Sequence, residues 1–346
     1  MLESDFEKIL PVMKAPSPSL LWAVVACWLF PVSASACLWD RDTLRDEKDL
    51  HPGIYDLITG RIPHHGDAYY EARIKRIRGE EEKRALTDEE KNDLAVAMVR
   101  LKRFDEAHQV LSELIAADPS NYYAQSNLGV LEKKRGNYAL AAEYIEKALQ
   151  LKPGGHMGLG TWYLDQLVYR AALAEDPDLV PKNNFLGISY QEAFELNAMS
   201  IPHEGASKSD YYRRLQRLIQ NDRTFPDGYV VMGDYLSKTG ELNLAFLAYT
   251  KAIDLGHSNP DEIRRRRRAL LRHFEEYVDR KRFFISSSRT RWWSAKIKEA
   301  QEEIAAGDAW LEEFQSVEAR LVETKQDLVS FDDVYEARPR LQSERD

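Results

Sequence analysis

The sequence has very little cysteine and no hydrophobic run long enough to span a membrane comfortably. Only Cys27 and Cys37 occur among its 346 residues, and both lie near the N-terminus. The rest of the chain therefore cannot form an internal disulfide or a zinc site built on cysteine. The longest apolar run, Leu20–Phe30, has eleven residues, whereas a membrane-spanning helix needs about 20. Stability must come from the packing of apolar side chains, which a chain of this length can supply.

The sequence also lacks the short motifs of common catalytic sites. It contains no GxxxxGK[ST] phosphate loop, no HExxH zinc motif and no GxSxG nucleophile motif. His64 and His65 are adjacent, and no cysteine or carboxylate stands near them at ligand spacing. We therefore predict a protein that is not an enzyme and has no cofactor. A metal site at His64-His65 stays open as the alternative.

Positive charge is in deficit, because the formal net charge is −9 and the pI is about 5.5. This balance argues against general nucleic-acid binding. The arginines gather in one run, Arg264–Arg268. Five consecutive helical residues point all round the helix, so at least one should meet packing or a carboxylate. The alternative is a patch for anionic lipid or an acidic partner.

The first 36 residues have the layout of an export signal. Lys14 precedes the apolar run, and Ala34-Ser35-Ala36 follows it as a small-residue cleavage pattern. Met13 is an alternative start site. Cys37 would then be the first mature residue, where lipidation would tether the protein to a membrane. An uncleaved anchor is the other interpretation. We expect an exported protein in the periplasm or cell envelope of a bacterium.

One pattern of small and apolar residues occurs three times, and the first two copies are offset by 34 residues. Its anchors and the residues at matching positions are Leu94, Ala95, Ala107 and Leu111, then Leu128, Gly129, Ala141 and Ile145, then Met232, Gly233, Ala245 and Tyr249. In the second copy the spacing predicts helices over 122–135 and 138–151, joined at Gly136-Asn137. Gly129 and Ala141 should let the two helices approach closely, and Pro153 should end the second helix.

These residues resemble the tetratricopeptide repeat (TPR), most closely over Asn121–Pro153. The resemblance implies an all-α fold: a right-handed superhelix of antiparallel helix pairs that holds a protein or peptide on its concave side. Residues 37–66, with Tyr69-Tyr70-Glu71, are similar to exported bacterial TPR proteins.

We expect the following organisation. Residues 1–36 are the signal peptide, and 37–66 cap the first helix layer. Residues 67–258 form the repeat array, with helices over 161–174 and 209–221 and an insertion near 176–208 that is either a binding loop or a plain connection. Residues 259–336 form a C-terminal helical cover that packs on the final repeat, with its long helix interrupted near Gly307. Residues 337–346 are disordered.

In TPR arrays the first helix of each pair lines the concave side, which predicts the partner-binding residues. They are Asn92, Val96, Tyr123, Ser126, Asn127, Val130, Lys134, Val230, Asp234 and Lys238. The function predicted is that of an exported scaffold or adaptor for a protein or peptide partner. The alternative is an enzyme-associated or structural envelope lipoprotein that acts through residues 176–208 or His64-His65.

Overall fold

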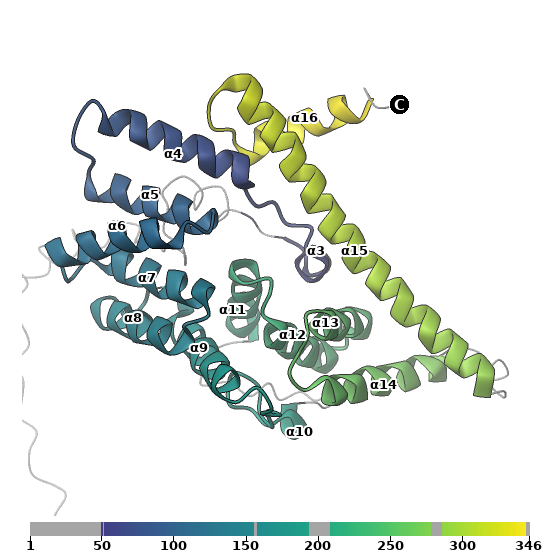
Figure 1. Cartoon of the computed structure of the whole chain (residues 1–346). Coiled ribbons are helices and arrows are strands. Elements are labelled where there is room, and N and C mark those ends of the chain that lie inside the picture. Colours follow the sequence, from purple (N-terminus) through teal and green to yellow (C-terminus); the bar gives the residue numbers. More distant parts are fainter. Residues whose placement is uncertain (1–49, 51, 156–157, 194–207, 278–285, 344–346) are drawn as a thin grey trace, which may run out of the picture. The chain divides into compact units, whose positions relative to one another are not determined.

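The computed structural model describes residues 50, 52–155, 158–193, 208–277 and 286–343, which are helical and contain no β-strand (Figure 1). They belong to the unit formed by residues 35–346. The predicted signal peptide, Met13 and Cys37 lie outside the described residues. None of the described helices is long and apolar enough to cross a membrane.

The first two copies of the repeat form two antiparallel helix pairs, as predicted. They are α5 (Asp88–Arg100) with α6 (Phe104–Ala117), and α7 (Tyr122–Arg135) with α8 (Tyr138–Leu151). Gly136 ends α7 with a φ of 85°, a conformation that favours glycine. A Cβ added to Gly129 would lie 2.6 Å from Ile145 Cδ1 and 3.2 Å from the Ala141 carbonyl oxygen. The predicted close approach of α7 and α8 is therefore confirmed.

The third copy repeats this geometry with a larger side chain at the crossing. Helices α12 (Pro226–Thr239) and α13 (Leu242–Asp254) pair, and Gly240 ends α12 with a φ of 88°. A Cβ on Gly233 would lie 2.4 Å from the ring of Tyr249, which stands where Ile145 stands in the second copy. The Tyr249 hydroxyl donates to Asp234 Oδ1 at 2.7 Å. The extra polar atom of this copy is thus satisfied inside the pair.

The helices between the second and third copies are also at the predicted places. They are α9 (Gly160–Glu175) and α11 (Lys208–Asn221), with the short α10 (Tyr190–Ala193) inside the insertion. Tyr190 fixes the insertion to the third repeat, because its hydroxyl donates to buried Asp227 at 2.6 Å. Residues 194–207 of the insertion lie outside the described residues.

Segment 37–66 is described only in part, so its predicted role as a cap on the first helix layer stays a prediction. Its described part forms α3 (Ile54–Thr59), which packs on α11, α13 and the long C-terminal helix α15 (Ser286–Lys325). Leu57, Ile58 and Ile62 are fully buried in the same core as the third copy. Burial of these apolar side chains against the third copy therefore stabilises the position of α3. The first layer instead contains α4 (Asp67–Glu81), packed on α5 and α15.

The C-terminal cover packs on α13 as predicted, but α15 is one continuous helix with no interruption at Gly307. A Cβ at this position would lie 2.1 Å from the carbonyl oxygen of Thr59. The glycine therefore marks a contact between α15 and the end of α3. The last described helix, α16 (Phe331–Ser343), buries Ala337, and the predicted disorder of residues 337–346 stays a prediction.

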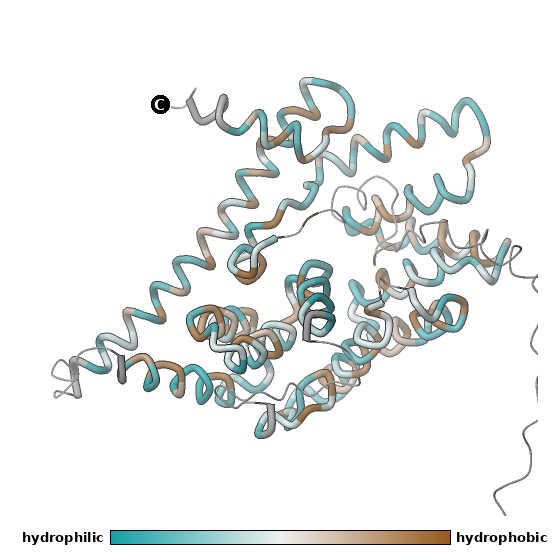
Figure 2. The backbone as a smooth tube through the Cα atoms, turned by 180° about the vertical axis from the view of Figure 1, so that it is seen from behind, coloured by the Kyte–Doolittle hydropathy of each residue, from teal (hydrophilic) through white to brown (hydrophobic). Residues whose placement is uncertain are grey.

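The arginine run lies on α14 (Pro260–Tyr277), where one member is fully buried. Arg266 bonds Asp234 Oδ1 at 2.8 Å and the carbonyl of Tyr190 at 2.6 Å. The prediction that at least one arginine meets a carboxylate is confirmed. Along most helices hydrophobic and hydrophilic stretches alternate (Figure 2), as expected where each helix buries one face. The all-α, TPR-like fold is thus confirmed, and its right-handed superhelical twist stays a prediction.

Candidate functional site

Most of the predicted partner-binding residues are inside the fold. The buried ones are Asn92, Val96, Ser126, Asn127, Val130, Val230 and Asp234, whereas Lys238 is half-buried and Tyr123 and Lys134 are exposed. The Asn127 amide donates to Asn92 Oδ1 at 2.8 Å, which joins α7 to α5. The side chains of Asn92 and Asn127 therefore stabilise the packing of α7 against α5.

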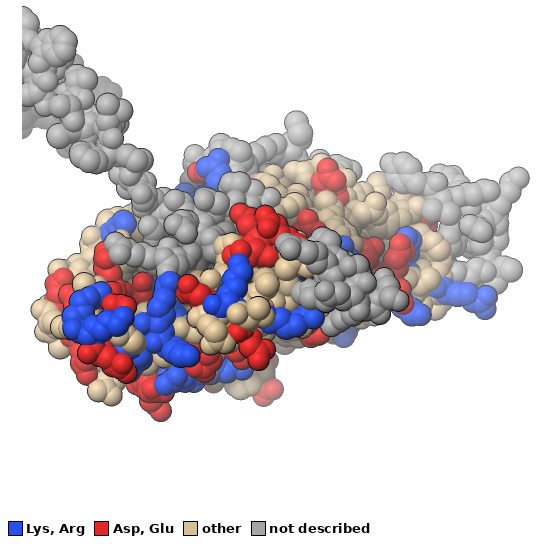
Figure 3. Space-filling model, turned by 90° about the horizontal axis from the view of Figure 1, so that it is seen from above, with Lys and Arg blue, Asp and Glu red and all other residues tan. Residues whose placement is uncertain are grey.

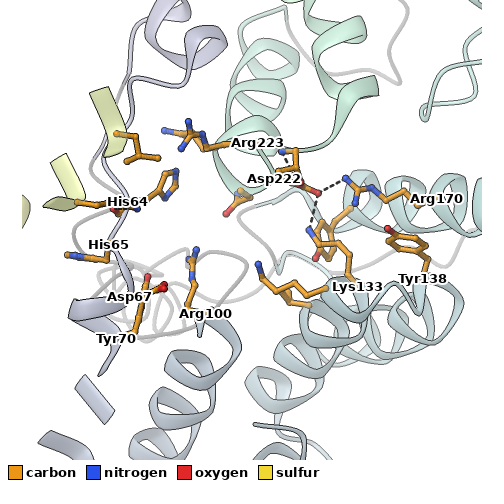
Figure 4. A pocket seen from close by; sticks show the side chains of 18 residues that line it. His64, His65, Asp67, Tyr70, Arg100, Lys133, Tyr138, Arg170, Asp222 and Arg223 are labelled. Atoms are coloured by element: carbon orange, nitrogen blue, oxygen red, sulfur yellow. Dashed lines mark hydrogen bonds and ion pairs between the residues drawn. The ribbon is translucent and has the colours of Figure 1, made fainter. Parts of the chain in front are cut away.

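The hollow side of the first helices is instead a cavity of about 520 Å³. Of the predicted residues, Val130 and Lys134 line it. Its wall comes from α4, α5, α7, α8, α9, the end of α11 with the following turn, the 64–65 loop and α15 (Figure 4). The residues are His64, His65, Asp67, Tyr70, Arg100, Val130, Lys133, Lys134, Tyr138, Tyr163, Arg170, Gln220, Asn221, Asp222, Arg223, Thr224, Leu311 and Gln315.

Asp222 organises one end of the cavity. Its Oδ2 accepts hydrogen bonds from Lys133 Nζ at 3.1 Å, Gln166 Nε2 at 2.7 Å and Arg170 at 2.9 Å. The other oxygen accepts from Thr224 Oγ1 at 2.8 Å and so shapes the turn before α12. Burial alone would raise the pKa of Asp222, but the charges of Lys133 and Arg170 lower it far below the ordinary value. Asp222 is therefore an anion that joins α7, α9 and the third repeat.

Lys134 lines the cavity from α7 beside this cluster; part of its side chain is exposed to solvent, while its ammonium group is partly desolvated by the surrounding walls. Desolvation by the surrounding walls, followed by the charges of Arg100 and Lys133, lowers the pKa of Lys134 to about 8, against an opposing effect of Asp222. Within the described residues no carboxylate forms an ion pair with Lys134. The direction of the shift shows that the cavity disfavours additional positive charge.

Arg223 connects the turn before α12 to the end of α3 and to α15. Its guanidinium donates to the Gly60 carbonyl at 2.8 Å and lies 4.0 Å from Asp308. Its Nε is buried and has no hydrogen-bond partner among the described residues. Arg223 also lines the cavity and places its positive charge there.

Helix α15 holds the loop that closes one side of the cavity. Gln315 donates to the His64 carbonyl at 3.2 Å, and Glu318 accepts from the Gly66 amide at 2.7 Å. Glu318 also bonds His65 Nδ1 at 2.5 Å, and His65 stacks on Tyr69 with ring centroids 3.6 Å apart. His65 is thereby engaged in fixing the loop. Among the described residues, no cluster of three or more His, Cys, Asp or Glu could hold a metal ion.

The lining is strongly cationic for so acidic a protein. Five Lys and Arg side chains face two Asp side chains in the cavity, an excess of three positive charges, whereas the whole chain carries −9. On the face shown in Figure 3, Lys and Arg are interspersed with Asp and Glu. The cavity thus differs from that surface in its electrostatics, and its chemistry suits an anionic ligand.

Sequence reasoning missed several of these residues. Arg100 lies 34 residues before Lys134, so the repeat period would have identified it. Lys133 is adjacent to a predicted residue but faces Asp222. Arg170, Asp222 and Arg223 stand outside the three matched copies, and no local pattern marks them.

Comparison with protein families supports the repeat assignment. Residues 92–156, which cover nearly all of α5 to α8, match the tetratricopeptide repeat family. No curated protein matches the chain.

Proposed function

We propose that this tetratricopeptide-repeat protein is a scaffold that binds a protein partner by holding an anionic group of the partner in the cationic cavity. TPR repeats favour protein–protein interaction, and an all-α TPR fold is typical of scaffolds that are not enzymes. The observation that carries the proposal is the cavity on the hollow side of the first helices, with its excess of positive charge.

The size of the cavity decides what part of a partner can enter. A helix is about 10 Å wide with side chains, so its cross-section is roughly 80 Å². A volume of about 520 Å³ would then hold little more than one helical turn. The cavity is therefore suited to a side chain or a short extended segment of a partner.

The electrostatics decide what kind of segment is favoured. Cationic side chains set between the low-dielectric walls of Tyr138, Tyr163 and Leu311 attract an anion more strongly than they would in open water. Lys134 is exposed at this site, so it can meet the incoming group. A basic or neutral segment would have no comparable gain.

Binding of defined peptides tests the proposal. Fluorescently labelled hexaglutamate and hexalysine are titrated into the purified chain, in which Lys134→Ala removes one cation of the cavity. Lys238→Ala is the matched control, because Lys238 occupies the equivalent position of the third copy and does not line the cavity. We expect hexaglutamate alone to bind, with affinity reduced about fivefold by Lys134→Ala, corresponding to about 1 kcal/mol. Equal effects of the two variants would contradict the location of the site.

Export to the bacterial cell envelope is a further part of the proposal, and it depends on residues 1–37. Mass spectrometry of the N-terminus after expression of the full chain in a bacterium tests it. A chain that begins at Cys37, with or without an acyl group, would support export. An uncut chain recovered from the cytoplasm would contradict it.

A further inference from the structure

We infer that the anionic group held in the cationic cavity is a phosphate monoester, carried either by a free small molecule or by a phosphorylated side chain. The inference takes the location of the site from the proposed function and adds the chemistry of its occupant. It depends on how many positive charges in the cavity are already neutralised, on their geometry and on the space around them.

The charge count favours a dianion over a single carboxylate. Lys133 and Arg170 share one carboxylate, that of Asp222. Counting Asp67 as well, the lining keeps an excess of three positive charges, of which Asp308, 4.0 Å from Arg223, offsets one. A carboxylate brings one negative charge, whereas a phosphate monoester brings about 1.5 to 2 near neutral pH. The phosphate therefore neutralises more of the excess with one compact group.

The cationic side chains come from separate elements and surround a common space. Arg100 lies at the end of α5, Lys133 on α7 and Arg223 on the turn before α12 (Figure 4). Lys134 lines the cavity from α7 as well. Arginine presents a planar set of donors that matches the oxygens of a phosphate, and lysine supplies a point charge. Arg223 lines the cavity with such a planar group, one nitrogen of which already donates to the Gly60 carbonyl.

The environment of Lys134 supports the same conclusion independently of the count. Its ammonium group is disfavoured by burial among the walls and then by Arg100, Lys133 and, more weakly, Lys102, while Asp222 opposes them. A bound dianion would compensate these cations and raise the pKa of Lys134 toward its ordinary value. Phosphate affinity should accordingly fall as the pH rises through about 8, where Lys134 loses its proton in the unliganded protein.

The available volume limits the ligand to a phosphate with a small attached group. At about 520 Å³, the cavity falls in the range of pockets for small molecules, about 300 to 1,000 Å³. The 64–65 loop and α15 form part of its wall. A phosphorylated side chain can enter such a space, and so can a small phosphorylated metabolite.

The experiment is a calorimetric titration of the full chain with four probes at low salt. The probes are inorganic phosphate, free phosphoserine, a phosphoserine peptide, and the same peptide with glutamate at that position. We expect the phosphoserine peptide to bind at least tenfold more tightly than the glutamate peptide, with the preference reduced at pH 9. Lys134→Gln should weaken phosphate binding at least fivefold, and Lys238→Gln, which keeps every residue of the cavity, should leave it unchanged. Circular dichroism checks that both variants stay folded.

The outcomes separate the sources of the phosphate and the two proposals. Equal affinity for free phosphoserine and its peptide indicates a small-molecule ligand, and tighter peptide binding indicates a phosphorylated partner; both support the inference. Equal binding of the phosphoserine and glutamate peptides would overturn the inference and leave the proposed function intact. Binding of none of the probes would overturn both, and equal losses in the two lysine variants would overturn the assignment of the site to the cavity.

Discussion

The close contact between Gly307 of α15 and the end of α3 allows the stability of a Gly307→Ala variant to be predicted. The 64–65 loop, which lines the cavity, follows α3 and is also held by α15. Substitution of Gly307 by alanine places a Cβ 2.1 Å from the Thr59 carbonyl oxygen and 2.7 Å from its carbon. Real Cβ contacts essentially never fall below 3.0 Å, so the two backbones must separate by about 0.9 Å. Because the obstacle is backbone, no side-chain rotation relieves it.

The size of the effect follows from two opposing contributions. Overpacking of this kind costs about 1–3 kcal/mol, and the upper half of that range applies to a backbone obstacle. Alanine in place of glycine inside a helix gains roughly 0.5–1 kcal/mol. Gly307→Ala should therefore lower the free energy of unfolding by about 1–2 kcal/mol. Gly79→Ala on α4 is the matched control, because nothing lies within 4 Å of its added Cβ, and it should raise stability by up to about 1 kcal/mol.

Urea denaturation followed by circular dichroism measures both changes, and hydrogen exchange locates them. We expect Gly307→Ala to reduce amide protection in α3 and in the 59–66 segment that follows it, since that segment is held by α15. A Gly307→Ala protein that is as stable as the wild type, with unchanged protection there, would refute the argument from close contact. Weak affinity for phosphate probes in this variant would further link α15 to the cavity.

Three other predictions concern the charged groups of the site. Asp222→Ala should lower the free energy of unfolding measured in urea by about 3–5 kcal/mol, because Lys133 then stays buried without its carboxylate partner. A loss below about 1 kcal/mol would show that the ion pairs of Asp222 contribute little to stability. The folded pKa of Asp222 lies below its ordinary value of 3.8, so the contribution of Asp222 to the free energy of unfolding is present above about pH 4 and is lost as the pH falls toward the folded pKa. The difference in stability between the wild type and Asp222→Asn should therefore shrink between about pH 5 and pH 2. A constant difference would contradict a lowered pKa of Asp222. Glu318→Ala should lower the free energy of unfolding by about 2–3 kcal/mol and expose the Gly66 amide to hydrogen exchange, because it removes the buried acceptor of that amide. Retained protection of the amide would mean that α15 does not hold the 64–65 loop.

The parts of the fold that were predicted correctly depend on residues close together in the sequence. The turn at Gly136, the end of α8 before Pro153 and the crossing of Gly129 with Ala141 each involve neighbours within one repeat. Such local constraints are visible in the spacing of small and apolar residues. The period of 34 residues would even have added Arg100 to the site through its equivalence with Lys134.

The errors concern contacts between distant segments. Segment 37–66 is predicted to cap the first layer, whereas its described helix α3 packs on the third copy; Gly307 is predicted to interrupt α15 but accommodates the end of α3. The groove residues were placed correctly on first helices. What their positions could not show is that most of them are buried within the array.

Sequence alone determined that the described part of this chain is helical and that residues 92–156 form TPR pairs. It also selected Val130 and Lys134 as binding residues, and both line the cavity. Only the tertiary structure decided that this side is a cationic cavity. Asp222 meets Lys133 from 89 residues away, and Gln315 reaches His64 across 251 residues. Contacts over such separations are chosen by the packing of whole helices against one another, and no periodicity within the sequence encodes them.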